Sequence, residues 1–166
     1  MRNPHVLSSL VLAALASAAP AAAQKAVIVV RHADNAKDAL TEAGQARAGR
    51  LLAMLKNAGV EAVYSTDTVR TMETAKPLAD ARKLTVKIYD TAAGENAFDA
   101  RPFAARLRKD NPNDVVLVVG HTTTIPDLLK SLGCPDEITV APLDYDDLFV
   151  VVPDGKGGAT LVRLKY

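Results

Sequence analysis

Short runs of consecutive apolar residues alternate along the chain with longer segments in which apolar residues recur every three or four positions. The short runs are typical of strands buried on both faces of a parallel sheet, and the longer segments of helices with one buried face. Strands are predicted at 26–30, 61–65, 86–88, 115–119, 148–152 and 159–164, and helices at 40–58, 67–82, 102–109 and 125–132. This alternation predicts an α/β domain, a three-layer α/β/α sandwich whose mostly parallel sheet ends in an antiparallel C-terminal edge hairpin.

The first 23 residues follow a different pattern. Arg2 gives a positive start, residues 6–19 form an apolar run, and Ala21-Ala22-Ala23 supplies a small-residue cleavage site. The alternative is a membrane anchor, but the run is shorter than the roughly 20 residues that span a bilayer. We therefore expect a bacterial Sec-type signal peptide at 1–23 and a mature domain at 24–166, periplasmic or secreted and without a membrane segment after cleavage.

Composition and charge exclude some partners and favour none strongly. The formal net charge of +1 gives no electrostatic reason to expect nucleic acid as a partner. Almost half of the residues are apolar, which is enough for a core in a single domain of this length. Cys134 is the one cysteine, so a monomer has no disulfide, and we expect its side chain to be buried as a small apolar group.

Basic and imidazole side chains follow three of the predicted strands. Arg31 and His32 follow the first strand, Arg70 lies one turn into the helix after the second, and His121 follows the fourth. Ligands of open parallel sheets bind beyond the carboxyl ends of the strands, so these four side chains should converge there. The remaining histidine, His5, lies in the predicted signal peptide.

Two arginines and two histidines favour a site for a phosphoryl group. The planar guanidinium matches phosphate oxygens, and a neutral imidazole is a good nucleophile near pH 7. Zinc is the competing interpretation of two histidines, but it needs further ligands, and adjacent arginines would repel the ion. No cluster of carboxylates suggests Mg²⁺. We therefore expect no metal and no cofactor.

The same residues lie in motifs that resemble those of the histidine phosphatase superfamily, which includes the phosphoglycerate mutases. Residues 29–33, Val-Val-Arg-His-Ala, resemble its strand–Arg-His-Gly signature. Residues 64–75 and 116–122 resemble its second and third motifs, and residues 40–44 resemble the usual opening of its first helix. The resemblance implies that His32 accepts the phosphoryl group while Arg31, Arg70 and His121 bind its oxygens.

The chain departs from that family pattern at three places. Ala33 stands where glycine is commoner, so the loop must admit a Cβ atom. Asp38 stands where the family often has asparagine, and we expect this anion to point away from the phosphate. Larger members carry the leaving-group acid in an insertion after the third strand; here the tentative acid is Glu95, with Asp34 as the other candidate. Small members that act on phosphohistidine proteins resemble this chain in their short loop.

These observations predict an exported, metal-independent phosphatase that hydrolyses a small phosphorylated substrate through a phosphohistidine intermediate on His32. One alternative is a phosphohistidine protein phosphatase, although the usual substrates of such enzymes are cytoplasmic. Another is a module that binds a phosphorylated ligand without turnover, for which the presence of His32 would have no obvious use. A mutase would need a larger lid than this chain can build.

Overall fold

The computed structural model describes residues 24–89 and 98–166. Its elements are β1 (Ala26–Arg31), β2 (Asn35–Ala36), β3 (Ala39–Leu40), α1 (Glu42–Leu55), β4 (Val60–Ser65), α2 (Val69–Arg82), β5 (Val86–Ile88), α3 (Ala100–Asp110), β6 (Val115–Gly120), α4 (Ile125–Ser131), β7 (Asp147–Pro153) and β8 (Ala159–Lys165). Each predicted helix and strand is present, with ends that differ from the prediction by at most three residues. The β2–β3 hairpin was not predicted, because strands of two residues are too short to show a periodicity.

The main sheet has six strands in the order β5-β4-β6-β1-β7-β8. Neighbours from β5 to β1 are parallel, whereas β7 is antiparallel to both β1 and β8. This confirms the predicted mostly parallel sheet with an antiparallel C-terminal edge. Because β7 runs against β1, the start of β7 lies beside the end of β1, where Leu148 pairs with Val30.

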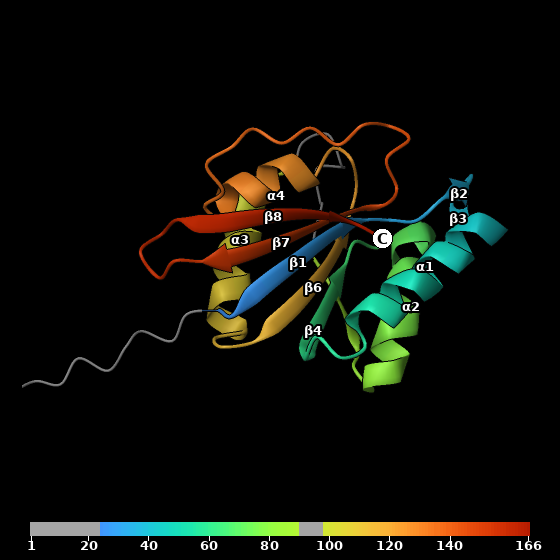
Figure 1. Cartoon of the computed structure of the whole chain (residues 1–166), viewed down its shortest axis with the longest axis horizontal. Helices are drawn as coiled ribbons and strands as arrows, with labels where there is room; N and C mark the ends of the chain where they lie inside the picture. Colours follow the sequence, from blue (N-terminus) through green and yellow to red (C-terminus); the bar gives the residue numbers. More distant parts are fainter. Residues whose placement is uncertain (1–23, 90–97) are drawn as a thin grey trace, which may run out of the picture.

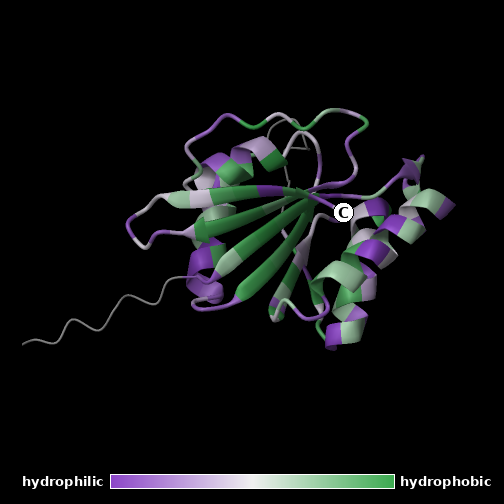
Figure 2. Cartoon of the chain, viewed as in Figure 1, coloured by the Kyte–Doolittle hydropathy of each residue, from purple (hydrophilic) through white to green (hydrophobic). Residues whose placement is uncertain are grey.

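Helices cover both faces of this sheet, and β1 shows why. Val27 and Val29 belong to the core formed with α3 and α4, whereas Ile28 and Val30 belong to the core formed with α1 and α2. Successive side chains of a strand point to opposite faces, so an unbroken apolar run requires cover on both sides. Figure 1 shows α1 and α2 on one side of the sheet and α3 and α4 on the other, and Figure 2 shows the apolar strands between them.

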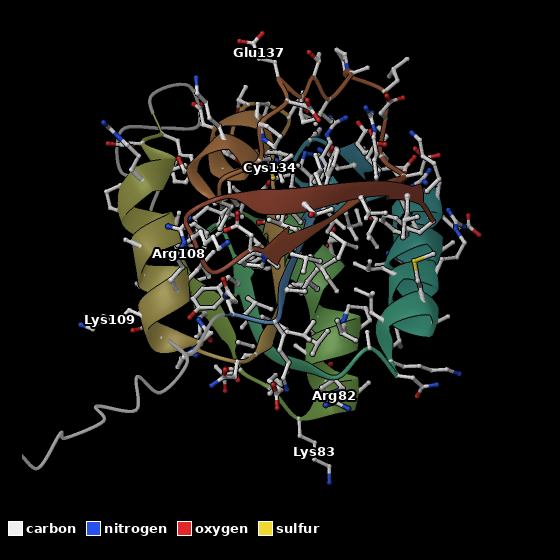
Figure 3. All side chains as sticks on the ribbon, turned by 60° about the vertical axis from the view of Figure 1, so that its left-hand side comes forward. Arg82, Lys83, Arg108, Lys109, Cys134 and Glu137 are labelled. Carbon is white, nitrogen blue, oxygen red and sulfur yellow. The ribbon has the colours of Figure 1, made fainter. Side chains whose placement is uncertain are left out.

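Each helix that follows a parallel strand returns to the opposite edge of the sheet. At the end of α2, Arg82 donates from Nε to the Val60 carbonyl oxygen at the start of β4, at 3.1 Å. Figure 3 shows Arg82 and Lys83 pointing outward at this edge. The beginning of α2, with Arg70, therefore lies at the carboxyl edge, where β1, β4 and β6 end.

The described residues include one cysteine and no helix suited to cross a membrane. The Cys134 side chain is a buried free thiol, and burial raises its pKa, which confirms the expected apolar role. Within residues 24–89 and 98–166, no helix is both long and apolar enough to cross a membrane.

Candidate active site

The carboxyl edge of the sheet brings together the four side chains that the sequence placed there. His32 follows β1 and His121 follows β6, and their ring centroids lie 5.4 Å apart. The Nη2 atom of Arg70 lies 3.3 Å from Nδ1 of His121. Arg31 is the last residue of β1, and it is buried together with both imidazoles.

Hydrogen bonds fix which nitrogen of His32 can attack. The His32 Nδ1 atom lies 2.9 Å from the Ala33 carbonyl oxygen. A carbonyl oxygen only accepts, so Nδ1 carries the hydrogen and donates it. In a neutral ring the lone pair is then on Nε2. His32 thus presents Nε2 as its nucleophilic atom.

The turn after His32 is held by α2. Thr74 accepts from the Ala33 backbone N–H at 2.9 Å, and Glu73 accepts from the Leu40 N–H at 2.8 Å. The Cβ atom of Ala33 is accommodated, because Ala33 is buried in a small cluster with Leu40 and Ala48. The substitution of the family's usual glycine therefore does not open this loop.

The hydrogen-bond partners of His121 also show which of its ring nitrogens carries the hydrogen. Arg70 can only donate, so the Nδ1 atom of His121 accepts from it. The Nε2 atom then carries the hydrogen and donates to the Thr66 hydroxyl at 2.8 Å. Thr66, which follows β4, lies 2.9 Å from the Thr71 hydroxyl of α2. This buried chain holds the ring with Nδ1 beside Arg70.

Arg31 has a buried donor that no described residue accepts. Its Nη1 atom donates to the Pro142 carbonyl oxygen at 2.6 Å, and its guanidinium carbon lies 4.0 Å from the Tyr145 ring centroid. Its Nε atom is buried and has no hydrogen-bond partner among the described residues. A buried unpaired N–H of a cation is costly, so its presence points to an external acceptor.

We expected Asp38 to point away from the site, but its carboxylate contacts Arg70. Its Oδ1 atom accepts from Arg70 Nη1 at 2.8 Å, and its Oδ2 atom accepts from the Val69 backbone N–H at 3.2 Å. The β2–β3 hairpin turns the carboxylate toward the start of α2, so that Asp38 orients Arg70. An incoming phosphate must share this arginine with Asp38.

Both imidazoles are neutral at physiological pH. Desolvation by burial, with Arg31 and Arg70 nearby, lowers the pKa of His32 to about 4. Desolvation, followed by the charge of Arg70, lowers the pKa of His121 to about 3. Loss of hydration and nearby cations both disfavour a protonated ring. The Nε2 lone pair of His32 is therefore available well below pH 6.

The candidate acids do not converge in the described part of the chain. Glu95 lies outside the described residues, as does the predicted signal peptide. Asp34 accepts from Arg47 Nε at 2.6 Å, and this ion pair holds the pKa of the carboxyl below its usual value. An ionised carboxylate has no proton to give, so Asp34 is not suited to the role of leaving-group acid.

Sequence reasoning placed Thr66 after a strand without giving it a role, and it missed Tyr145. The Tyr145 ring centroid lies 5.9 Å from that of His32, although Tyr145 precedes a strand. Only the residues after strands were considered, whereas the antiparallel β7 brings its preceding residues to the same edge. The predicted C-terminal hairpin was the signal that could have found Tyr145. Within the described ranges, no three His, Cys, Asp or Glu side chains form a set that could hold a metal ion.

Residues 21–93 match the model of the histidine phosphatase superfamily (branch 1). The resemblance to this superfamily is confirmed. The match includes Arg31, His32 and Arg70, whereas His121 lies beyond it. No curated protein sequence matches the chain.

Solved phosphatase structures share the fold. The protein histidine phosphatase SixA, complexed with tungstate, is 22% identical with a TM-score of 0.67, covering 84% of this chain and 96% of that one. Phosphoserine phosphatase from Entamoeba histolytica is 15% identical with a TM-score of 0.65, covering 86% and 98%. A mycobacterial glucosyl-3-phosphoglycerate phosphatase is 14% identical with a TM-score of 0.59, covering 86% and 98%. Over residues 21–93 the chain resembles the histidine phosphatase superfamily, and these solved structures show that it shares their fold.

Proposed function

We propose that the protein hydrolyses phosphate monoesters through a phosphohistidine intermediate on His32, without a metal ion. The observation that carries the proposal is the buried Nε donor of Arg31, which lacks an acceptor among the described residues next to a histidine with its Nε2 lone pair available. A phosphoryl oxygen supplies the acceptor that Arg31 lacks. The phosphorus of the same group is the electrophile that His32 needs.

The reaction takes two displacements. His32 Nε2 attacks phosphorus, the N–P bond forms, and the bond from phosphorus to the leaving oxygen breaks with its electron pair on that oxygen. Water then attacks the phosphorus of phosphohistidine, the N–P bond breaks, and inorganic phosphate leaves. The released water proton is taken up by solvent, and His32 regains its lone pair.

Stabilisation of the transferred group comes from fixed positive charge. Arg31 and Arg70 place two guanidinium groups around the site, and Asp38 and Pro142 hold them by hydrogen bonds of 2.8 and 2.6 Å. Charge spreads over the equatorial oxygens in the transition state of phosphoryl transfer, so positioned cations lower the barrier. The Nδ1 atom of His121 accepts from Arg70, so His121 acts by orienting this guanidinium toward the site.

A phosphohistidine residue on another protein is a second candidate substrate. The observation that favours it is that Asp34 and Asp38 are both ion-paired, so neither is suited to protonate a leaving alkoxide. An imidazole leaving group needs less help than an alkoxide, because it is much less basic. The fold shared with SixA, described as a protein histidine phosphatase, agrees with this possibility.

Turnover of p-nitrophenyl phosphate tests the proposal, with His32→Ala as the inactive variant. We expect activity that disappears in the variant, is unchanged by EDTA, and is accompanied by an acid-labile, base-stable label on His32 from ³²P-substrate. Turnover by His32→Ala, or loss with EDTA that a divalent metal restores, would refute the mechanism. A binding module would retain tungstate binding and never become labelled.

We also propose that the protein is exported and that residues 1–23 are removed. The charge, apolar run and small-residue pattern of this segment support the proposal. Mass spectrometry of the protein from a periplasmic fraction should give a chain that begins at Gln24. In an Ala23→Phe variant, which places a bulky residue at the cleavage site, processing should stop. A full-length chain confined to the cytoplasm would contradict the proposal.

A further inference from the structure

The connection between α4 and β7 brings groups from the C-terminal part of the chain to Arg31. In Figure 1 this connection leaves α4, runs across the top of the view and returns to the start of β7. Its residues Pro142 and Tyr145 both contact the Arg31 guanidinium. Neither residue belongs to the motifs that resemble the superfamily, and both lie beyond the family match at 21–93.

Pro142 and Tyr145 restrict Arg31 in different ways. The Pro142 carbonyl oxygen accepts a hydrogen bond from Nη1 at 2.6 Å, which restricts the orientation of the guanidinium group. The guanidinium carbon lies over the Tyr145 ring, 4.0 Å from its centroid. A planar cation is attracted to the face of an aromatic ring at such distances. We call the Pro142 carbonyl and the Tyr145 ring the Arg31 clamp.

The clamp decides which edge of Arg31 remains available. Nη1 is occupied by Pro142 and one face is covered by Tyr145, whereas the buried Nε has no partner among the described residues. The side chain of an unrestrained arginine has many rotamers, and ordering it on ligand binding costs conformational entropy. A guanidinium that is already oriented avoids most of that cost.

Tyr145 is also close to the nucleophile. Its ring centroid lies 5.9 Å from that of His32, and the two planes are inclined by 57°. The ring therefore contacts both Arg31, the last residue of β1, and His32, which follows it. A side chain placed in this way can keep Arg31 and His32 in a constant relation.

We propose that Tyr145 is a positioning residue, whose ring holds Arg31 with its Nε atom directed at the phosphoryl oxygens. The inference rests on the proposed function, because it assigns the acceptor of Nε to the substrate. It goes beyond that function by giving the α4–β7 connection a role in oxyanion affinity. The ring supplies the cation–π contact with Arg31, and the hydroxyl adds a hydrogen-bond interaction with the same side chain.

Binding of tungstate, measured by isothermal titration calorimetry on the full protein, tests this without requiring turnover. A stacked cation–aromatic pair corresponds to about threefold to thirtyfold in an equilibrium constant. We expect Tyr145→Leu to weaken tungstate binding about tenfold, and Tyr145→Phe, which keeps the ring, to weaken it less. Leu143→Ser is the matched control, because Leu143 lies in the same connection and is 84% exposed.

A double-mutant cycle with Arg31→Ala separates positioning from a general effect on the fold. If Tyr145 acts through Arg31, Tyr145→Leu should cause no further loss of tungstate binding in the Arg31→Ala background. Equal losses in both backgrounds, no loss with Tyr145→Leu, or a Tyr145→Phe variant as weak as Tyr145→Leu would overturn the inference. Tyr145→Met replaces Tyr145→Leu if the latter does not fold, as judged by its Tm.

The unmodified protein provides the separate test of the proposed function. If it does not bind tungstate, the phosphate site itself is wrong and the inference falls with it. If it binds tungstate but turns over no phosphoester, catalysis is wrong, and the cycle of Tyr145 and Arg31 variants still decides the role of the clamp.

Discussion

As the pH is lowered, we expect kcat/KM to fall with a midpoint near pH 4, whereas a histidine with the usual pKa of 6.5 would give a midpoint near pH 6.5. Burial, with Arg31 and Arg70 nearby, lowers the pKa of His32 to about 4 from the usual 6.5. At pH 5 an ordinary imidazole would be about 3% neutral, whereas one with a pKa of about 4 is about 90% neutral. The difference is roughly thirtyfold in the amount of free nucleophile, which kcat/KM reports for the unliganded enzyme.

Two measurements check this value. The kcat/KM for p-nitrophenyl phosphate, corrected for the ionisation of the substrate itself, should stay within about twofold between pH 7 and pH 5. In NMR titrations, the imidazole signals of His32 and His121, assigned with His32→Asn and His121→Asn, should shift only below about pH 5. A chain that keeps residues 1–23 should show one further histidine signal, from His5, in both variants.

The same shift predicts the direction of the change in stability. Because the folded-state pKa is lower than that of the unfolded chain, the unfolded chain binds a proton first as the pH falls. The contribution of each histidine is thus fully present above about pH 6.5 and is lost progressively toward about pH 4 for His32 and about pH 3 for His121. A titration of His32 or His121 near pH 6.5 would refute the desolvation argument.

The remaining predictions concern stability, measured as the free energy of unfolding in urea. A Cβ atom on Gly44 would overlap the backbone carbonyl of Asp34, so Gly44→Ala should destabilise the protein by about 1–3 kcal/mol. A Cβ atom on Gly49, in the same helix, meets no atom within 4 Å, so Gly49→Ala should be neutral or stabilising by up to about 1 kcal/mol. Equal effects of the two substitutions would contradict the packing argument. Buried Asp147 accepts from Arg163 at 2.6 Å, and these hydrogen bonds hold its pKa below the usual value despite burial. Asp147→Asn should therefore cost about 1–3 kcal/mol at pH 7. The cost should shrink as the pH falls below about 4, because the unfolded chain's carboxylate is protonated there before the folded one; a cost independent of pH would contradict this linkage.

Much of this protein can be predicted from its sequence, because the deciding interactions are local or periodic. The unbroken run at 26–30 requires cover on both faces wherever it lies, so it predicts a central strand and two layers of helices. Arg31, His32 and His121 follow such strands directly, and parallel strands end at one edge. Their convergence therefore needs no knowledge of the packing.

Other features depend on contacts between distant parts of the chain. The antiparallel pairing of β7 with β1 brings Tyr145 onto Arg31, more than a hundred residues away in the chain. The pairing of Asp38 with Arg70, which we expected to be absent, follows from the fold of the β2–β3 hairpin against the start of α2. The sequence alone determined which groups can perform phosphoryl chemistry. Only the tertiary structure decided which atoms of those groups are occupied, because hydrogen bonds and ring contacts from remote elements fix each side chain's orientation.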